Sequence, residues 1–150
     1  MADNSNHEKN SEQNQIYSPE LLEEARNFFS QDKYASKATG IQLEQIGEHY
    51  AQCSLEIQDI HKNAYGGVMG GVIFTLADFT FAASSNFRQP LTVSVTAQVN
   101  FIGMAKGKKL ISQSKLIKDG RTTCLYEINI ADELGTKVAF VTISGMKLEK

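Results

Sequence analysis

A single carboxylate, Asp78, stands in the most apolar part of the chain and is the residue best suited to chemistry. Between Asn63 and Phe87 it is the only charged residue. Burying an unpaired carboxylate costs several kcal/mol by a rough estimate. Asp78 is therefore either paired, as a cap or across an interface, or it serves as a general base or nucleophile in a cleft.

Two glycine pairs, Gly66-Gly67 and Gly70-Gly71, precede Asp78 at the expected start of a helix. Glycine lets another molecule approach the backbone closely. The free N–H groups of a helix start suit a developing negative charge, such as the oxyanion of acyl transfer. A tight turn that only serves packing is the alternative. No Lys-Ser or Lys-Thr follows, which excludes a phosphate-binding P-loop.

The segment 69–83 has the length of a helix, and its apolar residues occupy every side, so we expect it to be buried. Gly71, Thr75, Asp78 and Ala82 fall on one face. Three of these residues are small and leave room beside the carboxylate. Gly71 and Asp78 lie roughly 10 Å apart along such a helix. If both serve one reaction, Gly71 of one chain works with Asp78 of another, and a homodimer is the smallest catalytic unit.

The elements around this helix follow from periodicity. Ser18-Pro19-Glu20 is typical of a helix start, and apolar residues at helical spacing continue to about Ser30. Strand patterns dominate elsewhere: 41–43, 50–57, a strict alternation over 91–101, 110–118 and 123–130 around a hairpin turn at Asp119-Gly120, and 137–148. We predict an α+β fold with one helix cradled by an antiparallel sheet of five or six strands.

Composition limits the other possibilities. The 150 residues, 41% hydrophobic and 21% charged, suit one domain over 16–150, and a net charge of −2 gives no field for nucleic acid. Segment 1–15 is polar and is expected to be a disordered tail without a signal peptide. The apolar run 72–83 is too short to cross a bilayer, so we expect a cytoplasmic protein. Cys53 and Cys124 are predicted to be buried reduced thiols without zinc.

At its helix start the chain resembles a known family. Asn63-x-x-Gly66-x-x-Met69-Gly70-Gly71 and the following residues to Asp78 are similar to the signature of hot-dog-fold acyl-CoA thioesterases of the phenylacetic-acid-degradation type. The similarity runs from about Ile41 to Leu148. It implies a hot-dog fold, dimers that often pair into tetramers, and hydrolysis of coenzyme A thioesters without a cofactor.

The resemblance also implies roles for particular residues. Asp78 would activate water or attack the thioester, and the Gly71 amide would polarise its carbonyl. Asn63 would position the reacting groups, and Ser94 would match an assisting hydroxyl on a strand. The chain departs from the family at Met69, where a histidine is usual, because methionine neither donates a strong hydrogen bond nor shuttles a proton.

Several candidates keep two interpretations. Asn63 is equally well an Asx-turn residue, and Ser94 belongs to a polar strand side that could simply be solvated. Arg121 and the lysines at 106, 108 and 109 are hairpin or loop charges, or contacts to coenzyme A phosphates. Gly70, Met69 and Thr75 are further candidates for substrate contacts. His61 is expected at the surface near a strand end, and His49 is expected to be structural.

The preferred interpretation is a thioesterase of acyl-CoA. The alternative is a non-catalytic hot-dog module that binds an acyl-CoA, which Met69 keeps open. A dehydratase of the same fold is less favoured, because that chemistry normally needs an Asp–His pair and no suitably spaced histidine is seen.

Overall fold

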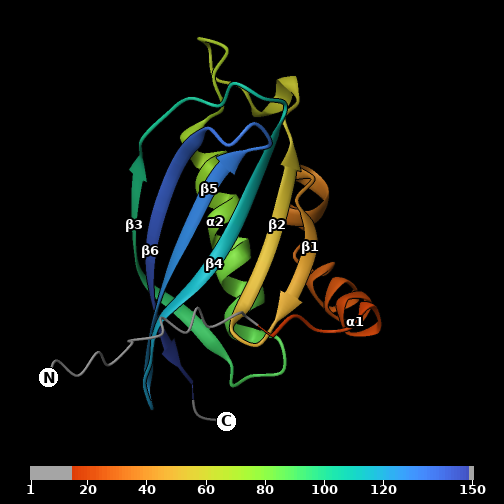
Figure 1. Cartoon of the computed structure of the whole chain (residues 1–150), viewed down its shortest axis with the longest axis vertical. Helices are drawn as coiled ribbons and strands as arrows, with labels where there is room; N and C mark the ends of the chain where they lie inside the picture. The colour runs from red at the N-terminus through yellow and green to blue at the C-terminus, as the bar shows by residue number, and fades with distance from the viewer. Residues whose placement is uncertain (1–14, 149–150) are drawn as a thin grey trace, which may run out of the picture.

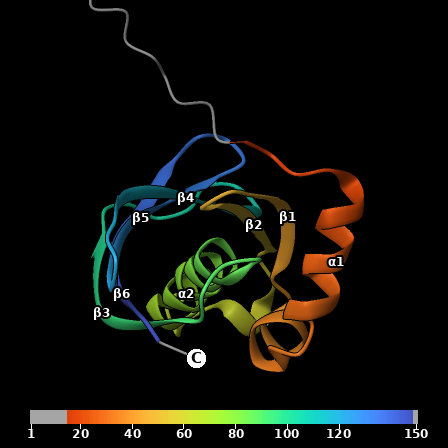
Figure 2. The same ribbon diagram turned by 90° about the horizontal axis from the view of Figure 1, so that it is seen from below.

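The structure is a computed structural model that describes residues 15–148. A six-stranded antiparallel sheet with strand order β1-β2-β4-β5-β6-β3 curves around one long helix, α2 (Figures 1 and 2). The elements are α1 (Pro19–Phe29), a π-helical turn (Tyr34–Thr39), β1 (Gln42–Gly47), β2 (Tyr50–Glu56), a short 3-10 turn (Asp59–His61), α2 (Gly70–Asn86), β3 (Thr92–Phe101), β4 (Lys109–Asp119), β5 (Thr123–Asp132) and β6 (Lys137–Lys147). The predicted α+β hot-dog architecture is confirmed, with six strands.

The helix α1 begins and ends where the sequence predicts. The Ser18 hydroxyl accepts the Leu21 N–H at 3.3 Å, and Pro19 occupies the first turn. The helix lies beside β1, outside the curve of the sheet (Figure 2). Arg26 donates from Nε to the Leu43 carbonyl at 2.8 Å, so α1 covers part of the outer edge of β1.

The helix α2 runs about one turn beyond the predicted end at residue 83. Three polar side chains of this last turn bond back to the helix: Ser84 Oγ to the Thr80 carbonyl, Ser85 Oγ to Phe81, and Asn86 Nδ2 to Ala82. The apolar pattern ends near residue 83, and the helix extends further because these polar side chains bond to its carbonyl groups. The expectation that α2 is buried on every side is wrong for the single chain, because Gly71, Phe74 and Asp78 are exposed.

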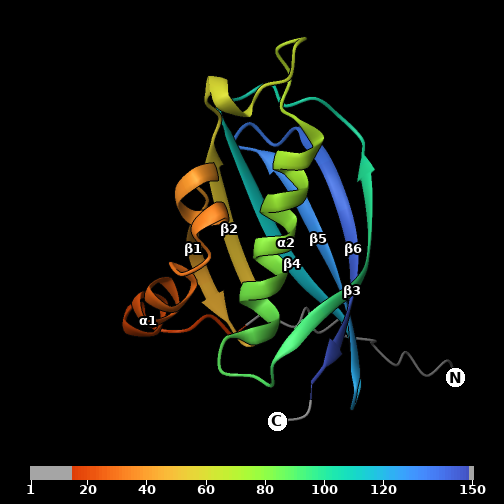
Figure 3. The ribbon, with the colours of Figure 1, turned by 180° about the vertical axis from the view of Figure 1, so that it is seen from behind.

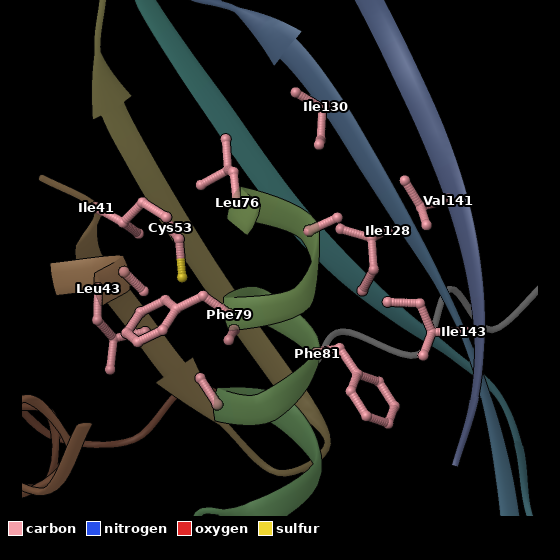
Figure 4. Close-up of a cluster of buried hydrophobic side chains, with 14 of the residues drawn as sticks. Ile41, Leu43, Cys53, Leu76, Phe79, Phe81, Ile128, Ile130, Val141 and Ile143 are labelled. Atoms are coloured by element: carbon pink, nitrogen blue, oxygen red, sulfur yellow. The ribbon is translucent and has the colours of Figure 1, made fainter. Parts of the chain in front are cut away.

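The core fills the space between α2 and the concave face of the sheet (Figure 4). Leu76, Phe79 and Phe81 of α2 meet strand residues such as Ile128 and Val141 there. Both cysteines are free and buried, as predicted. Burial raises the pKa of the Cys53 thiol to about 12, which keeps it neutral and unreactive.

The strict alternation predicted for 91–101 is interrupted by a bulge in β3. Its pairing with β6 shifts between Ser94 and Thr96. Beyond the bulge, Ala97 pairs with the buried Ile143, whereas before it Ser94 pairs with Gly145, whose missing side chain would meet Phe81 of α2. Ser94 and Ala97 therefore share the side that faces α2, which one uninterrupted alternation would not allow.

Among residues 15–148, no helix is long and apolar enough to span a membrane. The segment 1–15 that we expect to be disordered lies, apart from Gln15, outside the described residues. The carbonyl oxygen of Gln15 accepts the Glu48 N–H at 3.2 Å, and Ile16 forms a bridge to Gly47, so the chain joins the domain at the edge of β1.

Candidate active site on the open face of the long helix

Asp78 lies in the middle of α2 and is exposed to solvent. The sheet leaves one face of α2 uncovered (Figure 3). Within residues 15–148 its carboxylate has no hydrogen bond and no ion pair, so this chain shows no cap or salt bridge that explains it. A cavity of about 400 Å³ lies beside it. Although Asp78 is exposed on its open side, the groups around its carboxylate partly desolvate it. This partial desolvation, and secondly the charge of Asp32, raise the pKa of Asp78.

The start of α2 presents two free backbone donors. Val72 and Ile73 donate to the Met69 carbonyl, but neither Gly70 nor Gly71 gives its N–H to an acceptor in the described chain. A side chain at Gly71 would meet nothing within 4 Å, so this glycine borders open space. Free amides beside open space at a helix start can hold a carbonyl oxygen that becomes negative during a reaction.

Thr75 lies between these two groups on the same open face. Its hydroxyl donates to the Gly71 carbonyl at 2.8 Å, one turn back along the helix. Thr75 also lines the cavity of Asp78. The structure thus places Gly71, Thr75 and Asp78 in one row along α2, as their spacing predicts.

Asn63 shapes the glycine-rich loop that leads into α2. Its side-chain oxygen accepts the N–H groups of Tyr65 at 2.9 Å and Gly67 at 3.2 Å, while its backbone N–H donates to the Gly67 carbonyl at 2.7 Å. These bonds form an Asx turn, which is one of the two roles expected for Asn63. The Asn63 side-chain amino group makes no hydrogen bond within the described residues, and Asn63 lines a second cavity of about 450 Å³.

Met69, at the position where the family that the chain resembles usually has a histidine, contributes to the loop through its backbone. It is the residue before α2, its side chain makes no capping bond, and its N–H donates to the His61 carbonyl at 2.9 Å. The backbone path into α2 is therefore held without an imidazole. The side chain of Met69 is about half exposed.

Neither histidine of the described chain can replace it. The expectation that His61 lies at the surface is wrong: it is 3% exposed, accepts the Gln58 N–H at Nδ1, and meets the Thr39 carbonyl through Nε2 at 2.7 Å. Both ring nitrogens are thus engaged in structure. His49 contacts the Tyr126 hydroxyl through Nδ1 at 2.9 Å in the turn between β1 and β2, which agrees with a structural role.

Two other candidates lie away from the start of α2. Ser94 is exposed on β3, on the side that faces α2. Arg121 lies in the turn between β4 and β5, beside the C-terminal end of β6, where Lys147 donates its N–H to the Thr122 carbonyl. Gly70 packs against Phe101, which pairs with Ala139 at the other end of β6. This chain alone therefore does not bring Arg121 to Gly71.

Asp132 is a residue that the sequence analysis missed. It is 2% exposed, and its carboxylate accepts four backbone N–H groups at 2.8–3.0 Å, from Lys106, Gly107, Leu134 and Thr136. Glu133 likewise accepts the N–H groups of Lys108 and Lys109. These contacts fix the loop between β3 and β4, which forms one wall of the second cavity. The sequence did not indicate the role of Asp132, because the loop residues whose N–H groups it accepts, such as Lys106 and Gly107, are distant in sequence.

Comparisons with known proteins agree with this architecture. No family model matches the chain. Acyl-coenzyme A thioesterase PaaI of Escherichia coli is 27% identical over 106 residues, which cover 69% of this chain and 75% of PaaI. A protein of Archaeoglobus fulgidus that bears an esterase name is 23% identical over 121 residues, 80% of this chain and 79% of its own length.

Solved structures show the same fold. Escherichia coli PaaI superposes with a TM-score of 0.79 at 20% identity, covering 87% of this chain and 95% of that chain. A hypothetical thioesterase of Streptococcus pneumoniae, solved with coenzyme A, gives 0.74 at 18% identity, with 81% and 98% covered. The chain thus has the hot-dog fold. Its resemblance to thioesterases of the phenylacetic-acid-degradation type, predicted from the helix signature, is confirmed.

Proposed function

We propose that this protein is an acyl-CoA thioesterase that hydrolyses a coenzyme A thioester to a free acid and coenzyme A. Its sequence relatives are named thioesterase or esterase, which supports a thioester hydrolase. One observation carries the proposal for the site. Within residues 15–148, the unpartnered carboxylate of Asp78 and the free amide of Gly71 share the open face of α2.

The proposed site needs two copies of the chain. Gly71 and Asp78 are separated along one helix by roughly 10 Å, too far for one carbonyl group to touch both. A second copy that turns its α2 in the opposite direction brings its own Asp78 toward Gly71 of the first. Two-fold symmetry then makes two equal sites.

The strand β3 is the surface that we infer to pair with the second copy. It forms one edge of the sheet, and the stretch 91–101 carries no charged residue that would discourage pairing. Both of its sides are largely exposed, with Val95 at 59%. The opposite edge, β1, is covered by Gln15, Tyr17 and Arg26. One open edge favours a closed dimer over a growing chain of copies.

The proposed reaction follows from this geometry. The thioester carbonyl oxygen accepts the Gly71 N–H, which stabilises the negative charge that develops on it. Asp78 of the second copy either takes a proton from an attacking water or attacks the carbonyl carbon itself. In both routes the C–S bond breaks, and the coenzyme A thiolate leaves and takes up a proton. Attack by water gives the free acid directly, whereas attack by Asp78 gives an acyl-Asp78 anhydride, which water then hydrolyses to the free acid and the carboxylate. The substrates that we propose are thioesters of coenzyme A. The pairing of dimers into tetramers remains a prediction from the resemblance.

A non-catalytic module that binds acyl-CoA is the second candidate, and Met69 favours it. Its thioether cannot donate a strong hydrogen bond to the substrate or the water. Because the Met69 backbone still holds the loop in place, binding would survive even if the chemistry did not.

The two candidates separate in one assay. Purified protein is incubated with short-chain, long-chain and aromatic acyl-CoAs, and thiol release is followed beside Asp78→Asn. The buried Cys53 and Cys124 keep the background of a thiol reagent low. Turnover in the wild type that collapses in Asp78→Asn supports the enzyme. Binding of acyl-CoA without thiol release, by a folded protein, supports the module instead.

A further inference from the structure

The second wall of the cavity beside Asp78 comes from the segment that follows α1. Asp32 and Lys33, which follow α1, and Tyr34 and Ala35, which begin the π-helical turn, line this cavity together with Thr75 and Asp78 of α2. The edge of the Phe29 ring packs on Phe79 of α2, with centroids 6.0 Å apart. This contact fixes the end of α1, and with it the connecting segment, beside the open face of α2.

Asp32 is held firmly through its backbone while its side chain stays free. Its N–H donates to the Phe29 carbonyl at 3.0 Å, and its carbonyl accepts the N–H and the hydroxyl of Ser36 at 2.9 and 3.0 Å. Within residues 15–148 its carboxylate has neither a hydrogen bond nor an ion pair. Two carboxylates without partners therefore line one cavity from facing walls.

Like charges disfavour each other's ionised form, and Asp32 adds to the effect of burial in raising the pKa of Asp78. Lys33 and Tyr34 are the other ionisable residues that line this cavity. On its sheet side α2 faces the Cys53 thiol and the Tyr126 phenol. Burial raises the pKa of both, so they are uncharged near neutral pH.

We propose that Asp32 is a positioning residue of the active site, whose negative charge lies across the cavity from Asp78 and favours the protonated form of Asp78. It does not touch the substrate; it acts on the reaction through Asp78. Its part in catalysis rests on the proposed function. A more basic Asp78 is a better proton acceptor, because general-base strength rises with basicity.

The test measures the protonation of Asp78 directly. Carboxyl carbons are followed by NMR in protein labelled with ¹³C-aspartate, and the Asp78 signal is assigned by its loss in Asp78→Asn. Asp32→Asn removes the charge, and Asp32→Glu keeps it. Glu48→Gln is the matched control, because it removes an exposed charge from the turn between β1 and β2. The pH profile of kcat/KM is recorded for the same proteins.

We expect Asp32→Asn to move the Asp78 titration, and the acid limb of kcat/KM, to lower pH. The direction follows because Asp78 then loses its proton more easily. Asp32→Glu and Glu48→Gln should stay near the wild type. An Asp78 titration that is the same in Asp32→Asn and in the wild type would overturn the proposal. If Asp32→Asn shifts the Asp78 titration as expected but Asp78→Asn keeps full turnover, the proposed function of Asp78 is overturned and the electrostatic effect of Asp32 stands.

Discussion

Phe101 lies over Gly70 so closely that a side chain at this position would come within 3.0 Å of the ring. The next residue, Gly71, has open space where its side chain would be. The two neighbouring glycines therefore have different surroundings. Gly70 permits the close packing of β3 on the start of α2, whereas Gly71 borders open space.

The role of the Gly71 amide can be tested by removing its hydrogen. In Gly71→Pro the chain loses an N–H that has no acceptor in the described structure, and proline is tolerated in the first turn of a helix. Loss of one oxyanion donor should lower kcat by about 10²–10³-fold. The comparison is with Gly71→Ala, which keeps the N–H and whose added methyl group would meet nothing within 4 Å. Wild-type kcat in a folded Gly71→Pro would show that this amide is not used.

A matched pair of variants separates the two roles proposed for Asn63, which are shaping the loop through its side-chain oxygen and positioning the substrate through its amino group. Asn63→Asp keeps the oxygen that accepts from Tyr65 and Gly67, but it loses the free amino group, whereas Asn63→Ala loses both. If the amino group positions the substrate, both variants lose activity while Asn63→Asp keeps the wild-type melting temperature. We expect Asn63→Ala to be destabilised by about 1 kcal/mol for the lost turn contacts. An active Asn63→Asp would leave Asn63 with the loop role alone.

The proposed dimer predicts a contact between like residues. A two-fold axis that pairs Gly71 with Asp78 of a second copy passes near the residues midway between them, of which Phe74 is exposed. Phe74→Cys should therefore form a disulfide-linked dimer under mild oxidation. The wild type should not, because its two cysteines are buried. Glu20→Cys on α1 is the control for random collisions, and equal crosslinking of both variants would contradict this axis.

Asp132 gives the fold a defined dependence on pH. Burial alone would raise its pKa, but hydrogen bonds from Gly107, Lys106 and Thr136 outweigh burial and hold the pKa well below its usual range. A carboxyl group of this kind stabilises the folded state above its unfolded pKa of about 3.9, and the stabilisation is lost as the pH falls. Asp132→Asn should unfold at lower urea concentration at pH 7, and its difference from the wild type should shrink in acid. A constant difference across pH would contradict this account.

Local sequence patterns predict most of this fold, because neighbouring residues determine where many of its helices and turns begin and end. Ser18 and Pro19 mark the start of α1, and Asp119-Gly120 marks the turn between β4 and β5. The bulge in β3 was not predicted, because it depends on how two strands register rather than on either sequence. The end of α2 was placed too early for another reason, because polar side chains that bond back to the helix continue it beyond the apolar pattern.

The site was predicted only in part. The row of Gly71, Thr75 and Asp78 follows from helical spacing, and the structure shows it. Asp32 and Asp132 were missed, because tertiary contacts alone bring Asp32 to the cavity of Asp78 and Asp132 to the loop between β3 and β4. The buried place of His61 was also missed, since its partners, the Thr39 carbonyl and the Gln58 N–H, belong to the backbone and leave no mark in the sequence.

The central claim, that one site combines two copies of the chain, is tested most directly by mixing two inactive variants. Gly71→Pro and Asp78→Asn are co-expressed with different tags, and the mixed dimer is purified through both. Each mixed dimer regains one site that has both an intact Gly71 amide and an intact Asp78, so it should show about half of the wild-type turnover per dimer. A mixed dimer that is folded, binds acyl-CoA and remains as inactive as its parents would contradict the shared site.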